Sequence, residues 1–464
     1  MFREYDIRGI VENDLTPDIV EKIGRAYATL ARARGASTIT VGRDGRLTSP
    51  ALRDQLVAGL IGAGVNVVDL GLCATPQLYF SLYHCEVDGG IMITGSHNAA
   101  EYNGFKMCVG KEALYGADIQ HMRKIFESEM FASGRGTVVQ RPIIPDYLAF
   151  LQEHFASLRA ESLRVVIDCG NGAASLAAKD ALEQLGCQVT GLYCDLDGNF
   201  PNHHPDPTVV ENLADLIAKV KEVGADVGIG YDGDADRIGV IDEQGNILWG
   251  DRLLLLFARD VLREHPGSTI ISEVKASQVL YDDIQERGGR GIMWKAGHSL
   301  IKAKMKQEKA VLAGEMSGHV FFADRYYGYD DAIYASCRLI EILVKQHKPL
   351  STLLSDIRQT VVTPEIRVDC SDDQKFKLVE LVAQRLSEIT KSQDPTTSEM
   401  PIRDMITIDG IRVRFDEGWG LIRASNTQPA LVLRFEATSQ ANLLKIREFL
   451  EGHLDAANTC LMPI

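Results

Sequence analysis

The sequence lacks several features that would place the protein in a membrane, outside the cell or on nucleic acid. No segment approaches the roughly 20 consecutive apolar residues of a membrane-spanning helix. The first residues lack the basic-then-apolar pattern of a signal peptide, so we expect a cytoplasmic protein. Excess positive charge is also absent. The net charge of −15 disfavours nucleic acid and anionic lipid as partners unless a local basic patch compensates.

The nine cysteines show no CxxC spacing, and their number is odd. Thiols scattered in this way are typical of a protein in a reducing compartment. We therefore expect buried free cysteines, and the sequence assigns none of them a role.

Length and composition predict a soluble globular protein of three or four domains. The chain has 464 residues, too many for one core, with 45% hydrophobic and 24% charged residues. Short apolar strands alternate with amphipathic helices, which predicts mixed, largely parallel sheets with helices on both faces. The region after residue 360 indicates a smaller α+β domain. We place the domains at residues 1–144, 145–250, 251–360 and 361–464.

Three of the predicted strands run directly into polar loops. The strand at 90–93 leads into Thr94-Gly95-Ser96-His97-Asn98, and the strand at 227–229 leads into a cluster of aspartates. A third strand, at 310–313, enters Gly314-Glu315-Met316-Ser317-Gly318-His319. Because open α/β sheets bind ligands beyond the carboxyl ends of their strands, we expect these loops to carry the chemistry.

The aspartate cluster is the most informative stretch. In Gly228-Ile229-Gly230-Tyr231-Asp232-Gly233-Asp234-Ala235-Asp236-Arg237, three carboxylates alternate behind an apolar run. Three negative charges this close need a cation. If the segment is extended, alternate side chains share a side, so the carboxylates converge on one hard divalent ion. Arg237 then points elsewhere and can hold an anion.

Three other interpretations of this stretch must be weighed against a metal site. It could be an exposed acidic turn, the commonest context of Asp and Gly. An EF-hand loop fits the spacing of the aspartates, but its sixth position needs glycine and the chain has Arg237. The GxGxxG pattern of the glycines is followed by another predicted strand, so no helix N-terminus is available for a dinucleotide.

Ser96 lies at the tip of its loop. His97 suggests a Ser–His nucleophile pair, but adjacent side chains diverge in an extended segment and the GxSxG elbow is absent. Taken alone, the loop is equally consistent with a turn that has no chemical role.

Taken together, the loops resemble a known family. The motifs are Thr94-Gly95-Ser96-His97-Asn98 with Asn103-Gly104-Phe105-Lys106, Asp232-Gly233-Asp234-Ala235-Asp236-Arg237, Gly314-Glu315-Met316-Ser317-Gly318-His319, and Arg423-Ala424-Ser425-Asn426-Thr427. In this order, one per predicted domain, they resemble the α-D-phosphohexomutase superfamily. GEMSGH and Trp294-Lys295-Ala296-Gly297-His298 are most similar to its bacterial phosphomannomutase/phosphoglucomutase branch.

The resemblance implies a fold and a set of site residues. It implies four domains around a central cleft, with Ser96 carried as a phosphoserine. Mg2+ would be held by the three aspartates and a phosphoryl oxygen on Ser96. The other implied residues handle the proton or the phosphoryl group (Arg8, His97, Lys106, Arg237) or bind substrate (Tyr5, Lys275, His298, Glu315, Ser317, His319, Arg423, Ser425, Asn426, Thr427).

The implied activity is a phosphoryl transfer between O1 and O6 of mannose or glucose through a 1,6-bisphosphosugar, with glucose 1,6-bisphosphate as activator. Phosphoglucosamine mutase is the alternative within the class. Outside it, a nucleotide-dependent oxidoreductase and a calcium-binding protein that is not an enzyme are the competing hypotheses. The partner expected is a phosphorylated hexose, with no nucleic acid or membrane, and the protein is expected to be a monomer, with a dimer as the alternative.

Overall fold

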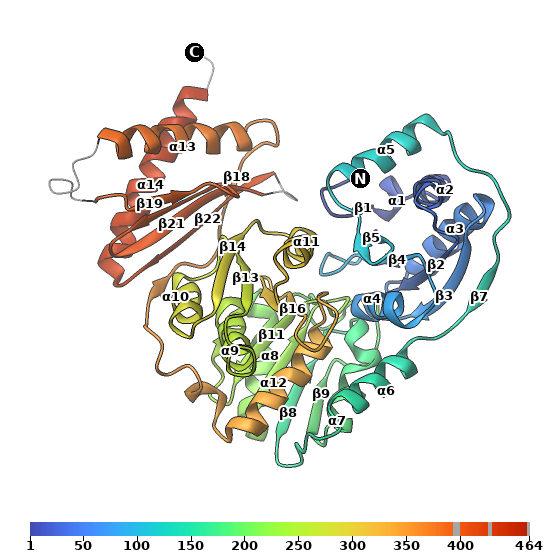
Figure 1. Ribbon diagram of the computed structural model, residues 1–464, viewed down its shortest axis with the longest axis horizontal. Coiled ribbons are helices and arrows are strands. Elements are labelled where there is room, and N and C mark those ends of the chain that lie inside the picture. The colour runs from blue at the N-terminus through green and yellow to red at the C-terminus, as the bar shows by residue number, and fades with distance from the viewer. Residues whose placement is uncertain (393–399, 426–428, 462–464) are drawn as a thin grey trace. The chain divides into compact units, whose positions relative to one another are not determined.

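The computed structural model describes residues 1–392, 400–425 and 429–461. The chain forms two compact units (Figure 1). The first comprises residues 1–271, 284–290 and 297–355, and the second comprises 272–283, 291–296 and 356–464. None of the helices in the described residues is long and apolar enough to cross a membrane.

The N-terminal sheet of the first unit is mixed, as the sequence predicts. Its strands run in the order β1 (Ile7–Ile10), β5 (Tyr102–Val109), β4 (Gly89–Ile93), β2 (Thr38–Arg43), β3 (Asn66–Leu72) and β7 (Val138–Gln140), and β6 (Glu112–Ala113) pairs with β5. The neighbours from β4 to β7 are parallel, whereas β5 is antiparallel to both β1 and β4. The accompanying helices are α1 (Val11–Asp14), α2 (Pro17–Ala33), α3 (Ser49–Gly62), α4 (Thr75–His84), α5 (Ala117–Ser128) and α6 (Ile144–His154).

Helices α2 and α3 pack closely because each contributes a glycine that faces the backbone of the other helix. A Cβ at Gly24 would lie 2.4 Å from the carbonyl oxygen of Leu56, and one at Gly59 would lie 2.1 Å from that of Glu21. Pro17 stands at the first turn of α2, where its missing N–H costs nothing.

The second sheet carries the aspartate cluster. Its strands run in the order β12 (Ile247–Leu248), β11 (Ile238–Asp242), β10 (Val227–Tyr231), β8 (Arg164–Asp168) and β9 (Gln188–Leu192). Strands β10, β8 and β9 are parallel neighbours, and β10 pairs antiparallel with β11. The helical segments here are η1 (Ala173–Leu176), α7 (Ala178–Gln184), η2 (Val210–Leu213) and α8 (Ala214–Val223).

The third sheet has the order β14 (Arg290–Trp294), β13 (Thr269–Glu273), β15 (Leu312–Gly314) and β16 (Val320–Phe322). The division between the two units crosses β13 and β14. Its helical segments are α9 (Gly250–Glu264), α10 (Gln278–Glu286), α11 (His298–Glu308), α12 (Ala332–Gln346) and η3 (Leu350–Thr352).

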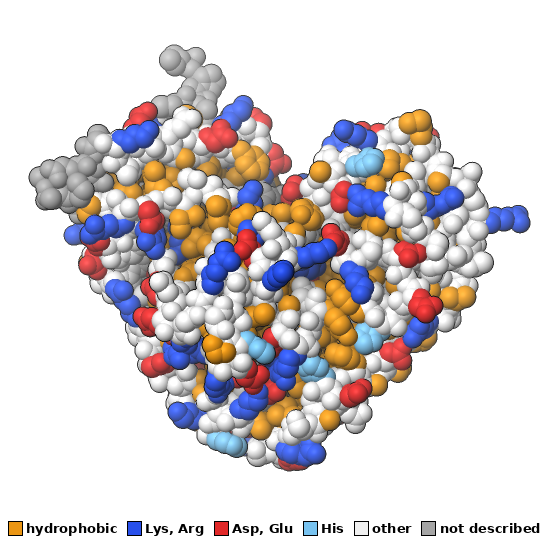
Figure 2. All heavy atoms as spheres, in the orientation of Figure 1, with side chains coloured by type: hydrophobic (Ala, Val, Ile, Leu, Met, Phe, Trp, Pro, Cys, Tyr) orange, Lys and Arg blue, Asp and Glu red, His pale blue; other side chains and the backbone are white. Residues whose placement is uncertain are grey.

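The C-terminal part of the second unit is an antiparallel sheet with two helices, α13 (Lys375–Ser392) and α14 (Gln440–Leu461), on one side (Figure 1). The strand order is β17 (Val361–Val362), β22 (Ala430–Ala437), β21 (Gly418–Ala424), β20 (Ile411–Phe415) and β19 (Asp404–Ile406), and β18 (Ile366–Asp369) also pairs with β22. This confirms the predicted fold class of α/β sheet domains followed by a smaller α+β domain. On the face shown in Figure 2, basic and acidic side chains are interspersed over each unit.

Candidate active site

The Ser96 loop follows β4 and is held by a buried arginine. Ser96 has a φ of 50°, in the left-handed region, and only 2% of its surface is exposed. Its N–H donates to the hydroxyl of Thr94 at 2.8 Å. The Arg46 guanidinium donates from Nη2 to the carbonyl oxygens of Ser96 at 2.8 Å and Asn98 at 2.6 Å. The serine is therefore fixed in an unusual backbone conformation, which is typical of functional sites.

The three aspartates converge, but not for the reason that the sequence suggests. Residues 232–237 form a turn between β10 and β11, with Ala235 at a φ of 60°. Asp232 Oδ1 accepts the N–H groups of Asp236 and Arg237, both at 3.1 Å. One carboxylate oxygen each from Asp232, Asp234 and Asp236 lie within 4.8 Å of one another, and all three residues are 0% exposed.

The serine and aspartate loops are in direct contact. Ser96 Oγ donates to Asp232 Oδ2 at 3.1 Å. Close packing makes this possible, since a Cβ at Gly233 would lie 2.3 Å from the carbonyl oxygen of Ser96. The hydroxyl predicted to carry the phosphoryl group thus faces the predicted metal ligands.

Lys106, on β5, supplies positive charge to the cluster. Its Nζ donates to Asp234 Oδ2 at 2.7 Å and also to Asp236 Oδ2. Burial opposes the charged amine, but the carboxylates of Asp234 and Asp236 outweigh it and raise the pKa of Lys106. The Thr75 hydroxyl, at the start of α4, donates to Asp234 Oδ2 at 2.5 Å.

The cluster fits a cation. Among the described residues, Oδ1 of Asp234 and Oδ1 of Asp236 are buried and have no hydrogen-bond partner. Burial, followed by the charges of Asp234 and Asp236, raises the pKa of Asp232 well above its usual range. Unpaired buried carboxylate oxygens are costly, whereas a hard divalent ion takes oxygen ligands of this kind. These residues can therefore hold a metal ion.

The structure corrects the expectation that the Ser96 and His97 side chains diverge. His97 Nδ1 lies 3.2 Å from Ser96 Oγ, because the left-handed conformation of Ser96 replaces the extended geometry on which that expectation rested. Burial lowers the pKa of His97 well below its usual range, and the charges of Arg237, Arg8 and Lys106 lower it further. The neutral form of the imidazole beside the serine is therefore favoured.

The two predicted arginines of the first unit both lie beside these loops. Arg8 donates to Asp6 Oδ2 at 2.6 Å and to the side chain of Asn98, within the serine loop. Arg237 Nε donates to His319 Nε2 at 3.2 Å and lies 3.9 Å from Asp232 Oδ2. Arg8 therefore contacts the serine loop, and Arg237 contacts the aspartate and GEMSGH loops.

The GEMSGH loop joins β15 to β16 and borders the aspartate loop. His319 Nδ1 lies 3.1 Å from the carbonyl oxygen of Asp236 and 3.2 Å from Asp330 Oδ2. The His298 ring stacks on that of His319 at a centroid distance of 5.5 Å, and Tyr5 meets His298 edge-on at 5.8 Å.

In the same loop, Glu315 Oε1 accepts from the Gly297 N–H at 2.6 Å, while Ser317 is half-buried. The predicted site residues of the first unit therefore lie on the serine, aspartate and GEMSGH loops or contact a residue of these loops. Tyr5 is the exception, since the contact described for it is with His298.

The remaining predicted residues belong to the second unit. Lys275 Nζ lies 3.0 Å from Glu365 Oε2 and 3.4 Å from Glu273 Oε1. Arg423, at the end of β21, pairs with Asp409 at 3.0 Å, and Ser425 is buried. The predicted residues Asn426 and Thr427 lie outside the described residues.

Sequence reasoning missed four supporting residues: Arg46, Thr75, Lys302 and Asp330. Asp330 Oδ1 accepts from Lys302 Nζ at 2.8 Å, and Asp330 is 0% exposed. The sequence gives only weak signals for two of these residues. Thr75 precedes a proline that begins a helix, and Asp330 stands in an adjacent pair of aspartates.

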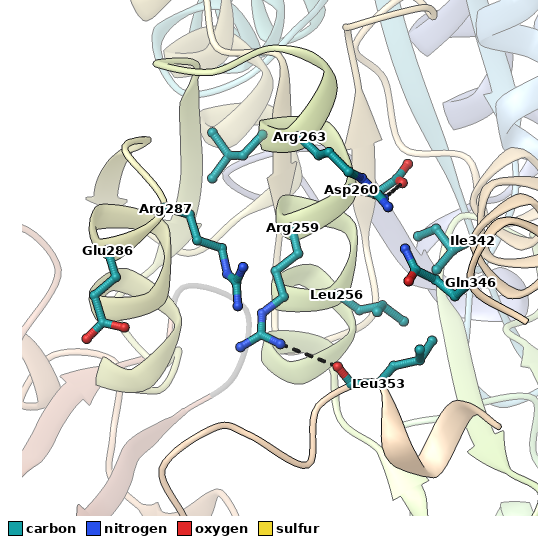
Figure 3. Close-up of a pocket in the computed structure, with 10 residues that line it drawn as sticks. Leu256, Arg259, Asp260, Arg263, Glu286, Arg287, Ile342, Gln346 and Leu353 are labelled. Atoms are coloured by element: carbon teal, nitrogen blue, oxygen red, sulfur yellow. Dashed lines mark hydrogen bonds and ion pairs between the residues drawn. The ribbon is translucent and has the colours of Figure 1, made fainter. Parts of the chain in front are cut away.

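A separate pocket of about 630 Å³ is lined by residues of α9, of the end of α10 and of α12, together with Leu353 (Figure 3). Arg259 and Arg287 point into it, Arg263 pairs with Asp260, and Arg259 Nη1 donates to the carbonyl oxygen of Leu353 at 3.3 Å. None of the predicted site residues line this pocket.

The fold and the site together define a class, because a serine hydroxyl that faces a buried carboxylate triad and a lysine is suited to metal-assisted phosphoryl transfer. The chain belongs to the phosphoglucomutase/phosphomannomutase family. The family's alpha/beta/alpha domains I, II and III match residues 1–133, 145–245 and 249–361, and its C-terminal domain matches residues 365–453.

Relatives resemble the chain over its whole length. A phosphomannomutase/phosphoglucomutase of Pseudomonas aeruginosa is 46% identical over 461 residues, covering 99% of this chain and 96% of that protein. A phosphoglucomutase of Neisseria gonorrhoeae is 43% identical, covering 100% and 98%. The crystal structure of a family protein from Burkholderia thailandensis has a TM-score of 0.90 and 41% identity, covering 98% and 97%. The chain is thus a phosphohexomutase, an isomerase.

Proposed function

We propose that this phosphohexomutase interconverts the 1- and 6-phosphates of mannose and glucose, with Ser96 as the residue that carries the phosphoryl group. The observation that carries the proposal is the 3.1 Å contact between Ser96 Oγ and Asp232 Oδ2, within a triad whose other members have unpaired buried oxygens. The full-length similarity to phosphomannomutase/phosphoglucomutase supports the two sugars.

In the proposed reaction, the bond between phosphorus and Ser96 Oγ breaks as a bond from phosphorus to a sugar hydroxyl oxygen forms. The hydroxyl gives up its proton, and Ser96 Oγ regains one. His97 Nδ1, 3.2 Å from Oγ, is placed to exchange that proton. The resulting 1,6-bisphosphosugar turns over and returns its other phosphoryl group to Ser96, which completes the isomerisation.

The triad of Asp232, Asp234 and Asp236 would hold Mg2+, which neutralises charge on the transferring group when it is bound. Lys106 keeps a positive charge beside the same oxygens, and Arg8 and Arg237 orient phosphoryl oxygens. Glu315 and Ser317 are proposed to bind sugar hydroxyls, with Tyr5, His298 and His319 as further contacts.

In the second unit, Arg423, Ser425, Asn426 and Thr427 are proposed to bind the phosphate that is not reacting, and Lys275 is proposed to contact the substrate. Forked guanidinium donors, hydroxyls and an amide in one short loop suit a phosphate. Glucose 1,6-bisphosphate would serve as activator by phosphorylating Ser96. A cytoplasmic location, the absence of nucleic-acid and membrane partners, and a monomeric or dimeric state stay predictions from the sequence.

A coupled assay tests this proposal. Mannose, glucose and glucosamine 1-phosphates are compared with Mg2+ and a catalytic amount of glucose 1,6-bisphosphate. We expect turnover of the first two sugars and little of the third. Ser96→Ala should lower turnover by orders of magnitude without changing the melting temperature, and Ser128→Ala, at an exposed serine of the same unit, is the control. Near-normal activity of Ser96→Ala would refute the phosphoserine, and a preference for glucosamine would favour the phosphoglucosamine alternative.

A further inference from the structure

Two free cysteines meet behind the aspartate loop. Cys169 follows the last residue of β8, and Cys194 lies two residues beyond the end of β9. Their sulfur atoms are 3.1 Å apart. A disulfide bond is about 2.05 Å long, so the two sulfurs need to approach by roughly 1 Å to form one.

The fold brings these two thiols together. Strands β8 and β9 are parallel neighbours in which Asp168 is paired with Leu192, and the Cys169 N–H donates to the Leu192 carbonyl oxygen at 3.1 Å. Tyr193, at a φ of 51°, then turns the chain back. The Cys194 sulfur occupies space beside a glycine, since a Cβ at Gly191 would lie 2.8 Å from it.

The two thiols differ in exposure and acidity. Cys169 is buried, whereas Cys194 is half-buried and reaches the surface. The hydrogen bond between the two sulfur atoms lowers the pKa of Cys194, and the same bond, together with burial, raises that of Cys169 well above its usual range. By contrast, burial raises the pKa of Cys73 and of Cys108 to about 12. Since the thiolate is the nucleophile, Cys194 is the thiol of this pair that an oxidant meets first.

The pair is also connected to the candidate active site. The Cys169 carbonyl oxygen accepts from the Gly172 N–H at 2.7 Å, and the next residue, Ala173, donates its N–H to the Gly233 carbonyl oxygen at 2.9 Å. A Cβ at Gly172 would lie 3.0 Å from Gly233 Cα, so this loop packs tightly under the aspartate loop. A shift of Cys169 therefore reaches the segment that carries Asp232 and Asp234.

We propose that Cys169 and Cys194 form a redox modification site, in which a hydroperoxide converts the two thiols to a disulfide that slows the phosphohexomutase reaction and is reversed by a dithiol. The Cys194 thiolate attacks a peroxide oxygen and becomes a sulfenic acid, and the O–O bond breaks to release water or an alcohol. Cys169 sulfur then attacks the Cys194 sulfur and expels water. Two thiols and one hydroperoxide thus give one disulfide, one molecule of water, and one further molecule of water or of an alcohol. A dithiol later supplies the two electrons that reduce the disulfide.

The dithiol is the resting state in the reducing compartment that the sequence predicts, where disulfides are usually transient and redox-sensing. The effect on turnover rests on the proposed function, but formation of the disulfide does not. The two parts therefore need separate measurements.

The first measurement is chemical. The full chain is treated with limiting hydrogen peroxide, its remaining thiols are alkylated, and its peptides are mapped by mass spectrometry. We expect a linked peptide containing Cys169 and Cys194 before the half-buried Cys85 and Cys370 are modified, and its disappearance on treatment with dithiothreitol. Oxidation of Cys85 or Cys370 without the linked peptide would overturn the proposal, whether or not the protein turns over a hexose phosphate.

The second measurement is kinetic. Oxidation of the wild type should lower turnover by roughly tenfold, since a displacement of about 1 Å in a supporting residue can cost up to about 100-fold. Dithiothreitol should restore the rate. Cys194→Ser should be resistant to peroxide, and Cys85→Ser, the matched control, should stay as sensitive as the wild type. A linked peptide in a fully active enzyme would reject control of turnover, and a loss of activity that persists in Cys194→Ser would assign the effect to another residue.

Discussion

Two buried carboxylate sites in the first unit, Asp331 and the aspartate triad, differ in whether the protein's own donors satisfy their oxygens. Asp331, at the N-cap of α12, is 1% exposed and accepts from three donors: the Tyr147 hydroxyl, which lies 3.0 Å from both carboxylate oxygens, the Tyr326 hydroxyl at 2.8 Å and the Tyr334 N–H at 2.8 Å. The triad is buried as deeply, but Oδ1 of Asp234 and Oδ1 of Asp236 have no hydrogen-bond partner among the described residues, although His319 Nδ1 lies 3.6 Å from Asp236 Oδ1.

This difference teaches that burial of a carboxylate does not by itself mark a site. Asp331 is satisfied by the protein's own donors, so it contributes to the structure whether or not a ligand is bound. In the triad, by contrast, the protein's donors leave two buried carboxylate oxygens without a hydrogen bond, and a cation can take these oxygens as ligands. Substitutions should therefore affect activity at the triad and stability at Asp331.

The largest effect is expected for Asp232→Asn. The amide oxygen can still accept the two backbone N–H groups, but the charge that would hold Mg2+ and face Ser96 is lost. We expect turnover to fall on the order of 1,000-fold, as for other losses of charge stabilisation in a transition state. Without metal, the melting temperature should stay the same or rise, because the variant no longer buries an ionisable group whose charged form is disfavoured by burial and by the charges of Asp234 and Asp236. A drop in metal-free stability with activity retained would contradict the comparison.

Asp331→Ala should have the converse effect. The variant leaves the hydroxyls of Tyr147 and Tyr326 without their acceptor and removes the cap of α12, which together cost about 4 kcal/mol. Thermal denaturation should show a clearly lower melting temperature, while turnover below that temperature stays within a few-fold of the wild type. Tyr147→Phe, which removes one donor and leaves the carboxylate, is the matched control and should cost about 1 kcal/mol.

The pH dependence of stability provides a second test of the role of Asp331. Burial raises the pKa of Asp331 to about 6, against the opposing effect of its hydrogen bonds. The folded state therefore binds this proton more tightly than the unfolded state does. The stabilisation is complete below the unfolded pKa of about 3.8 and is lost as the pH rises through about 6, with a total of up to about 3 kcal/mol.

Asp331→Asn, which is neutral at every pH, lacks this titration. The difference in stability between the variant and the wild type should therefore shift in favour of the variant between about pH 4 and pH 7. Melting temperatures of the two proteins across that range provide the measurement. Parallel curves would mean that the carboxyl group of Asp331 does not titrate there.

Local patterns predicted most of the elements that carry the site. The strands at 38–43, 89–93 and 227–231 come from short apolar runs, and the helix that begins at Pro17 comes from its proline and the apolar spacing that follows. The two strands around the aspartates also confirm the argument against an EF-hand and against a dinucleotide loop, because neither flank is a helix. These strands and this helix could be predicted because they depend on residues that are close together in the sequence.

Contacts between distant segments could not be predicted in the same way. The convergence of the aspartates arises from a turn with Ala235 in the left-handed region, and the contact of Ser96 with His97 arises from the same conformation at Ser96. Arg46 and Thr75 support the site over separations of 50 and 159 residues. The sulfur contact of Cys169 with Cys194 likewise depends on strand pairing, so cysteine spacing alone could not reveal it.

The smallest effect is expected in the second unit, where the predicted phosphate loop is tested by Arg423→Ala. Arg423 is buried and pairs with Asp409, and its guanidinium is proposed to bind the phosphate that is not reacting. We expect KM to rise by roughly tenfold, about 1.4 kcal/mol, with a smaller change in kcat, because this grip is made in the ground state as well as in the transition state. Arg423→Lys keeps the charge but loses the fork, so it should recover only part of the affinity.

Arg414→Ala is the matched control, because Arg414 pairs with Asp404 at 2.7 Å in the same sheet but is more exposed and has no proposed role. Its KM and kcat should equal those of the wild type. If Arg423→Ala and Arg414→Ala behave alike in steady-state assays, then the loop that begins at Arg423 does not bind the substrate. In that case Arg423 would be a structural partner of Asp409, as Tyr147 is of Asp331. The contrast between carboxylates with and without hydrogen-bond partners would then apply to the first unit alone.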